Sequence, residues 1–203
     1  FSGYQDFKIN LSQQLAADDY FVMHEIDEND SIHELCETVF DTTISEILNV
    51  RSQIDQNILE EAIEALANAR RVEFYAFGGS APVAMDAQHK FFRLKIPSSF
   101  ISDPHIQFMS ANSLGKKDVV VAISQSGTTS ALVDSVNIVR KSGVKVIGIM
   151  PAGTPLANIC DYPLTINVGD NNRLSKPNTS RICLLYTSPS PRDLSTSRMP
   201  SSA

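Results

Sequence analysis

The sequence predicts an α/β fold: a doubly wound sheet of five parallel strands in flavodoxin-like order, preceded by helical segments. Two observations carry this prediction. From residue 71 onward, short apolar runs rich in β-branched residues alternate with amphipathic helical stretches. Before residue 71, two longer stretches have apolar residues at helical spacing. Strands that alternate with crossover helices are typical of a parallel sheet covered on both faces.

The leading helices are expected at residues 31–50 and 54–69, the first with Asp30 as its N-cap. Their apolar stripes predict packing on the domain that follows or on a second copy of it. The stripe of the first helix consists of Ile32, Leu35, Val39, Ile44, Ile47 and Leu48, and that of the second of Ile58, Leu59, Ala62, Ile63 and Leu66.

The sheet itself is expected from residue 72 to residue 168. Apolar runs predict strands at 72–77, 96–101, 118–123, 144–150 and 163–168. Helices are expected between them at 83–94, 105–114 and 129–142, with a helical turn at 155–160. Gly143 is a suitable residue to end the third of these helices.

Composition limits the class of protein. The 203 residues carry a net charge of −6, which does not suggest a polyanion-binding surface over the whole chain. The three cysteines show no metal-binding or disulfide spacing, so no metal site is expected. Neither a signal peptide nor a membrane-length apolar run is present in this sequence, which favours a cytoplasmic protein with no membrane partner.

Two polar loops follow predicted strands and open helices. Residues 124–129 (SQSGTT) follow the third strand, and residues 78–80 (GGS) follow the first. In a flavodoxin-like order these two strands are neighbours, and ligands bind at the carboxyl ends of such strands. Hydroxyls, glycine and the N–H groups of a helix N-terminus suit a phosphate monoester. The alternative is an ordinary turn in which Ser and Thr cap the helix.

These motifs resemble the SIS (sugar isomerase) domain, which has a GxxS-like loop after its first strand and an SxSGxT loop after its third. Three further segments resemble the effector domains of RpiR-type transcription regulators, and most closely the HexR-type group. They are residues 86–93 (DAQHKFFR), 107–111 (QFMSA) and 152–157 (AGTPLA). The resemblance covers residues 1–182.

The resemblance implies a site for a phosphorylated sugar or sugar acid, such as a hexose phosphate or 2-keto-3-deoxy-6-phosphogluconate. No cofactor is implied. In the family's pattern Ser80, Ser124, Ser126 and Thr129 hold the phosphate, and the backbone of Gln125, Gly127 and Thr128 lines the loop. The expected phosphosugar-binding residues are therefore Gly79, Ser80, Ser124, Gln125, Ser126, Gly127, Thr128, Thr129 and His105. His105 would contact a hydroxyl of the ligand, and the alternative is that it caps a helix.

The resemblance also implies a domain organisation. Residues 1–29 would connect to a helix-turn-helix domain upstream of Phe1, and residues 30–182 would form the SIS domain with its leading helices. The chain would be a fragment of a homodimer or higher homo-oligomer that binds DNA only through the missing domain. Residues 183–203 are rich in Pro, Ser and Thr, which predicts a disordered or non-native tail; they also resemble translated sequencing-adapter read-through.

Isomerases in the same superfamily make an aldose–ketose phosphate isomerase the alternative function. Isomerisation needs a general base, for which Asp103, His105 and His89 are candidates. His89 is expected to face the sheet as a packing residue. Because spacing brings out no combination of nucleophile, base and orienting group, no catalytic residue is assigned. We expect a sensor of sugar phosphates that regulates transcription in carbohydrate metabolism.

Overall fold

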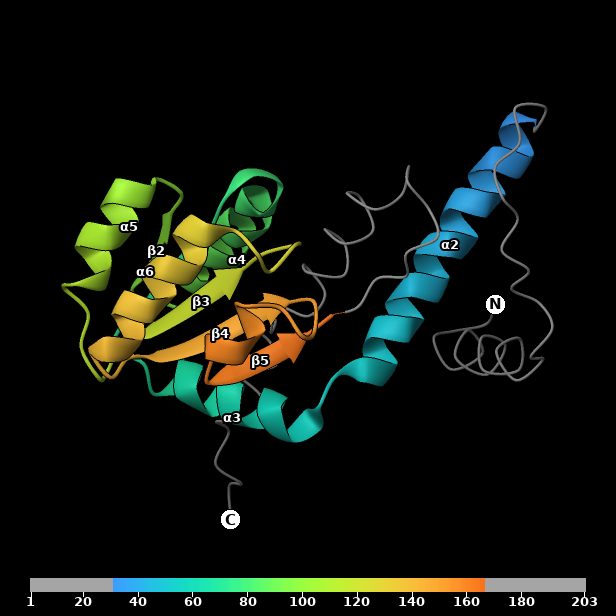
Figure 1. Cartoon of the computed structure of the whole chain (residues 1–203). Helices are drawn as coiled ribbons and strands as arrows, with labels where there is room; N and C mark the ends of the chain where they lie inside the picture. The colour runs from blue at the N-terminus through green and yellow to red at the C-terminus, as the bar shows by residue number, and fades with distance from the viewer. Residues whose placement is uncertain (1–30, 167–203) are drawn as a thin grey trace, which may run out of the picture. The chain divides into compact units, whose positions relative to one another are not determined.

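A computed structural model describes residues 31–166 of the chain (Figure 1). The chain divides into two compact units, residues 1–48 and 49–203, and each is treated by itself. The predicted connector at 1–29, the end of the predicted fifth strand and the predicted tail at 183–203 lie outside the described residues. Within the described part, no helix is long and apolar enough to cross a membrane.

Helix α2 (Ile32–Gln53) is the first described element and ends three residues beyond the predicted boundary. A capping box starts it: the Glu34 N–H donates to Ser31 Oγ over 3.3 Å, and the Ser31 N–H donates to Glu34 Oε2 over 2.9 Å. Ser31 therefore occupies the capping position that was predicted for Asp30. Ile32, Val39 and Phe40 are exposed on this helix, so its apolar residues are not all buried within one chain.

The sheet has the predicted parallel, doubly wound topology, with strand order β2-β1-β3-β4-β5. Its central strands are buried at almost every position, as expected for strands covered on both faces. The five strands are β1 (Val72–Ala76), β2 (Ser98–Ile101), β3 (Val119–Ile123), β4 (Lys145–Met150) and β5 (Tyr162–Thr165).

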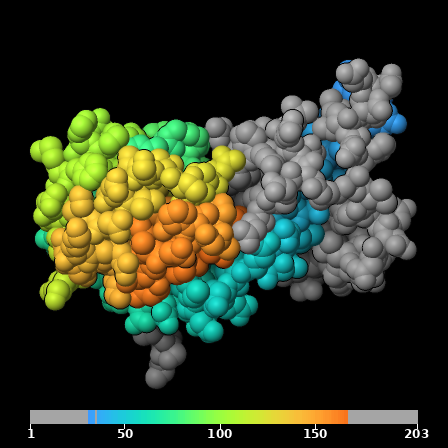
Figure 2. All heavy atoms as spheres, in the orientation of Figure 1, coloured from blue at the N-terminus to red at the C-terminus, as the bar shows by residue number. Residues whose placement is uncertain are grey.

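Helices cover both faces of the sheet (Figure 1). On one face lie α3 (Gln56–Ala67) and α4 (Ala81–Arg93), and on the other α5 (Pro104–Ala111) and α6 (Ser130–Lys141). The outer surfaces of α5 and α6 lie side by side in Figure 2. Two short 3₁₀ turns complete the fold: η1 (Gly78–Ser80) and η2 (Ala157–Ile159), the latter shorter than the helical turn predicted at 155–160.

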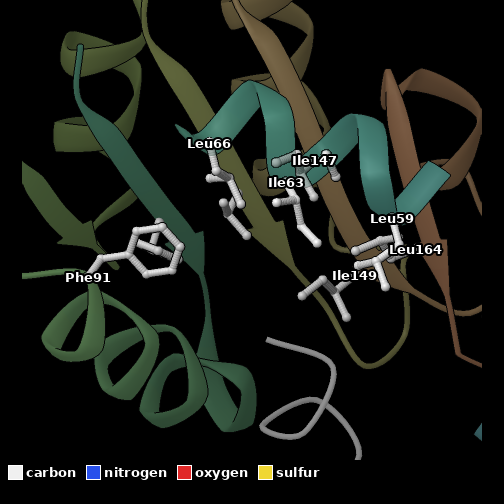
Figure 3. Close-up of a pocket in the computed structure, with 10 residues that line it drawn as sticks. Leu59, Ile63, Leu66, Phe91, Ile147, Ile149 and Leu164 are labelled. Atoms are coloured by element: carbon white, nitrogen blue, oxygen red, sulfur yellow. The ribbon is translucent and has the colours of Figure 1, made fainter. Parts of the chain in front are cut away.

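A small cavity lies on the α3 and α4 face of the sheet. It measures about 10 Å³, and all the residues that line it are apolar. Figure 3 shows Leu59, Ile63 and Leu66 of α3 directed at the sheet, with Phe91 entering from α4. A space of this size holds at most about one water molecule, which would find no polar partner there. The cavity is therefore a small gap in the packing of the core and does not serve as a ligand site.

A polar cluster lies near the amino ends of the strands, away from the predicted site. Asp118 is buried and accepts hydrogen bonds from Arg70 Nε at 2.8 Å and Arg70 Nη2 at 2.7 Å. These bonds lower the pKa of Asp118 below its usual value. Glu73 is also buried and accepts hydrogen bonds from the hydroxyls of Tyr75 and Ser110. The cluster anchors α5 and the loop before β1 to the sheet.

Candidate functional site

The two predicted loops leave the sheet at the same edge. Strands β1 and β3 pair in parallel, and Ala76 is in register with Ile123 at their carboxyl ends. The loop after β1 is η1, which begins at Gly78 with φ of +51°, a conformation that glycine adopts without steric cost. The loop after β3 consists of residues 124–129 and leads into α6.

A hydrogen bond joins these loops. The backbone N–H of Gln125 donates to Ser80 Oγ over 3.2 Å. Ser80 sits at the N-cap position of α4, yet its side chain makes no capping bond to that helix. The residue is 6% exposed, so the bond is sheltered from water. Ser80 therefore connects the two loops and does not cap its own helix.

Serine hydroxyls also shape the loop after β3. Ser124 Oγ accepts a hydrogen bond from the Gly127 N–H at 3.0 Å, and Ser126 Oγ accepts one from the Thr128 N–H at 3.3 Å. Ser124 is buried, whereas Ser126 and Thr128 are exposed. A hydroxyl that accepts one bond can still donate its own hydrogen. Within residues 31–166, the hydroxyls of Ser80, Ser124 and Ser126 donate to no protein acceptor, so each can donate to a ligand oxygen.

The N-terminus of α6 faces this loop without a side-chain cap. Thr129 occupies the N-cap position with extended backbone angles, φ −62° and ψ 108°, but makes no side-chain capping bond. The first N–H groups of a helix have no partner inside the helix. This geometry differs from the ordinary capped turn that was the alternative interpretation of residues 124–129. It leaves backbone donors and the positive end of the helix dipole available to an anion.

A third loop, which we did not predict as part of the site, packs against residues 124–129. It follows β4, the strand next to β3, and comprises residues 151–156. The Leu156 N–H donates to the Gly127 carbonyl over 3.1 Å. Gly127 has φ of +63°, and a Cβ placed there would collide with the side chain of Thr154. Residues 152–157 carried part of the family resemblance, but only the fold brings Thr154 against Gly127.

The remaining predicted residues take separate positions. Gly79 is exposed in the middle of η1. His105 is exposed in the first turn of α5 and makes no hydrogen bond to another described residue, while the neighbouring Asp103 caps that helix through the Ile106 N–H at 2.9 Å. His89 is exposed on α4, so our prediction that it faces the sheet was wrong. In residues 31–166 no group of three His, Cys, Asp or Glu side chains could hold a metal ion.

The three loops have no charged side chain, so any electrostatic attraction for an anion comes from dipoles. Residues 78–80, 124–129 and 151–156 contain no ionisable side chain. The groups with shifted pKa values lie elsewhere: Asp118 and Tyr75 belong to the polar cluster near the amino ends of the strands, and burial raises the pKa of Cys160, after η2, to about 12. The arrangement can hold an anion through hydroxyls, backbone N–H groups and the dipole of α6.

Two transcriptional regulators are similar to this chain over most of its length. The chain is 33% identical over 183 residues to the HTH-type transcriptional regulator HexR of Escherichia coli K12, covering 90% of this chain and 63% of that protein. It is 35% identical over 184 residues to HexR of Pseudomonas aeruginosa, covering 91% of this chain and 65% of that protein. The chain thus spans a little less than two thirds of the length of these relatives.

A solved structure extends the comparison to the fold. The NanR protein of Vibrio vulnificus, complexed with ManNAc-6P, superposes with a TM-score of 0.72 at 19% identity, covering 97% of this chain and 69% of that one. The family model of the SIS domain matches residues 65–188, which include β1 to β5 and all three loops. The chain therefore belongs to the SIS domain family.

Proposed function

We propose that this chain is the effector domain of a transcriptional regulator of carbohydrate metabolism, and that it senses a phosphorylated sugar or sugar acid. The observation that carries the proposal is the Ser80–Gln125 hydrogen bond of 3.2 Å. It joins two hydroxyl-bearing loops at neighbouring strand ends, beside a helix N-terminus that lacks a side-chain cap. A doubly wound fold binds its ligands at this position.

The phosphate would be held without a cation. The hydroxyls of Ser80, Ser124, Ser126 and Thr129 would donate to its oxygens, together with the N–H groups at the start of α6. Helix dipoles stabilise a nearby anion by about 0.3–1 kcal/mol, or roughly 2 kcal/mol when partly buried. Contributions of this size suit a ligand that binds and leaves as its concentration changes.

The sugar would extend from the phosphate toward the start of α5. Strand β2 lies next to β1, so the helix that follows β2 starts along the same edge of the sheet. His105 is exposed in the first turn of that helix and can contact a ligand hydroxyl. The NanR protein was solved in complex with ManNAc-6P, which supports a sugar phosphate as the ligand class for this chain. Hexose phosphates and 2-keto-3-deoxy-6-phosphogluconate are the candidates.

The regulator would act as a homodimer or higher homo-oligomer. Two of the relatives are helix-turn-helix regulators by name, and the chain spans only part of each. Exposed apolar side chains on α4 and α5 support self-association: Met85, Phe92, Ile106 and Met109 are each at least 55% exposed in the single chain. DNA recognition by sequence would belong to a helix-turn-helix domain outside the residues of this chain.

Thermal unfolding with a panel of sugar phosphates tests the proposed site. A ligand at about 100 times its dissociation constant stabilises the folded state by roughly 2.7 kcal/mol. Ser126→Ala should reduce this shift for phosphorylated ligands. Ser142→Ala is the matched control, because it makes the same change at the opposite end of α6. A folded chain that gives no shift with any hexose phosphate or phosphogluconate derivative would contradict the proposal.

Turnover separates a sensor from an isomerase. We expect no conversion of an aldose phosphate to its ketose by the folded chain. Formation of ketose that is lost in His105→Ala or His89→Ala would identify an enzyme, since isomerisation needs a general base within reach of the substrate.

A further inference from the structure

Basic side chains gather at the amino ends of the strands, opposite the proposed ligand site. Parallel register aligns these ends: Val72 pairs with Val119, and Val119 pairs with Lys145. The strands therefore start at one edge of the sheet, on the side away from the arrowheads in Figure 1. Six exposed cations lie in or shortly before β1, β3 and β4. We call them the basic edge, and they are Arg70, Lys116, Lys117, Arg140, Lys141 and Lys145.

Contacts hold these segments together as one surface. The Arg70 N–H donates to the Lys117 carbonyl over 2.8 Å. A Cβ placed at Gly143 would lie 3.2 Å from the side chain of Lys116, so this lysine runs alongside the turn between α6 and β4. In Figure 2 the turn before β3, in yellow-green, lies near the end of α6, in amber. Neighbouring strands are about 4.8 Å apart, so the starts of β1, β3 and β4 fall within roughly 10 Å.

The charge of the basic edge is only partly neutralised. Asp118 pairs with Arg70 at 2.7 Å, and Asp161 pairs with Lys145 at 3.5 Å. Arg140 and Lys141 complement the negative end of the α6 dipole. Lys116 and Lys117 form no ion pair with another residue of the described range.

Helix α3 has a surface of the opposite sign. Helix α3 contains Glu60, Glu61 and Glu64 and no cation. The chain as a whole has a net charge of −6, so the basic edge is a local reversal that the average hides. A polyanion would be repelled by α3 and attracted to the basic edge, which fixes the side from which it approaches.

We propose that the basic edge binds the phosphate backbone of double-stranded DNA. A duplex carries one charge per about 1.7 Å of its axis, and cations that neutralise its phosphates release condensed counterions. The six side chains of the basic edge are long, exposed Lys and Arg residues, which suit contact with the phosphate oxygens of the backbone. The choice of DNA over an acidic protein rests on the proposed regulatory function.

This inference assigns the SIS domain itself a contact with DNA. Contacts to the backbone position a protein on the duplex, while base contacts select the sequence. The basic edge would hold the effector domain against DNA that flanks the site recognised by a helix-turn-helix domain. Because the ligand loops lie at the other end of the same strands, both partners can bind at once.

Fluorescence anisotropy with a labelled duplex of about 20 base pairs and arbitrary sequence tests the proposal, starting near 50 mM salt. Lys116→Gln/Lys117→Gln should weaken binding by roughly tenfold or more and reduce the slope of log K against log salt by about two. Arg51→Gln/Lys90→Gln is the matched control, because it removes the same charge at solvent-accessible positions outside the basic edge. We expect its affinity to remain within about threefold of the parent chain.

Three outcomes would overturn the proposal. They are no binding of the parent chain at low salt, an equal loss in the control variant, and binding of poly-glutamate as tight as that of DNA, which would indicate an acidic protein partner. Thermal unfolding without ligand verifies that both variants fold. The sugar-phosphate shift of the Lys116→Gln/Lys117→Gln variant should match that of the parent chain, so a failure of DNA binding is distinguishable from a failure of the proposed ligand site.

Discussion

Ser80 Oγ accepts a hydrogen bond from the Gln125 backbone N–H at 3.2 Å, and this contact joins loops that are 45 residues apart in the chain. It explains why a small polar residue follows the glycines after β1. A larger side chain would not fit, because Ser80 is only 6% exposed. The same hydroxyl donates to no acceptor within residues 31–166, so its hydrogen is available to a ligand oxygen.

Ser80→Ala should therefore affect ligand binding more than folding. Loss of the acceptor should cost about 1 kcal/mol of stability. Affinity for a sugar phosphate should fall roughly tenfold or more, since charge-assisted hydrogen bonds contribute about 1.5–3 kcal/mol. Isothermal titration calorimetry and urea unfolding measure the two quantities. Unchanged affinity in a folded Ser80→Ala variant would show that this hydroxyl is not a ligand contact.

Gly127→Ala should distort the loop after β3. An alanine at φ of +63° is strained by about 1–2 kcal/mol, and its methyl group would also meet the Thr154 side chain. Gly127→Ala/Thr154→Gly removes the second cause and leaves the first, so it should recover part of the ligand affinity that Gly127→Ala loses. Calorimetric titration of both variants with the same sugar phosphate measures the recovery. If the double variant binds no better than the single one, the contact with Thr154 does not position the loop.

Asp118 should make stability depend on acid. Its pKa is lowered in the folded protein, chiefly by the hydrogen bonds from Arg70. The stabilisation by ionised Asp118 is therefore fully present above the pKa of an unfolded Asp, which is about 3.9. It is lost as the pH falls through the lower pKa of Asp118 in the folded protein. Asp118→Asn should cost roughly 1–3 kcal/mol at neutral pH, because buried partners lose their acceptor.

Urea unfolding of both proteins between neutral pH and about pH 3 measures this difference. The difference between the two unfolding free energies should become smaller toward the acid end, because the folded pKa of Asp118 is lowered. A gap that stays constant across this range would mean that the ionised form of Asp118 contributes nothing specific.

Cys160 should resist alkylation while the protein is folded. Burial raises its pKa to about 12, so almost no thiolate forms near pH 8, and the thiolate is the reactive species. Cys36 is exposed on α2 and should react first. Peptide mapping by mass spectrometry after iodoacetamide treatment distinguishes the sites, and prior unfolding in urea should abolish the difference. Equal labelling of both sites in the folded chain would contradict the raised pKa of Cys160.

The sheet could be predicted from sequence because β-branched runs bounded by turn residues have few alternatives. The run at 118–123 became β3, and the glycine-rich break at 78–80 became η1. It was harder to predict which face of a helix packs against the sheet. On α4, Phe91 is buried and Phe92 is exposed, although the two residues are chemically identical. Hydropathy alone could not decide which face of α4 packs on the sheet. Our prediction that His89 faces the sheet was wrong for this reason.

The sequence predicted two of the three loops of the candidate site and that these two lie next to each other. Strand order alone brings residues 78–80 beside residues 124–129. The third loop could not be found in this way, because its contact depends on a positive φ at Gly127 and on the side chain of Thr154. A glycine at position 127 permits a positive φ, but a single sequence does not say that the chain adopts it there or which side chain lies against it.

Strand β3 has five residues, all buried, with Asp118 directly before it and Ser124 directly after it. At about 3.3 Å per residue the strand is roughly 17 Å long, and it is hydrogen-bonded on both sides, to β1 and to β4. Close-packed interiors deform little, so the length of this buried strand changes little. Asp118 and Ser124 are therefore held at a fixed separation by one strand, and the hydrogen bonds from Arg70 attach its guanidinium to the same strand.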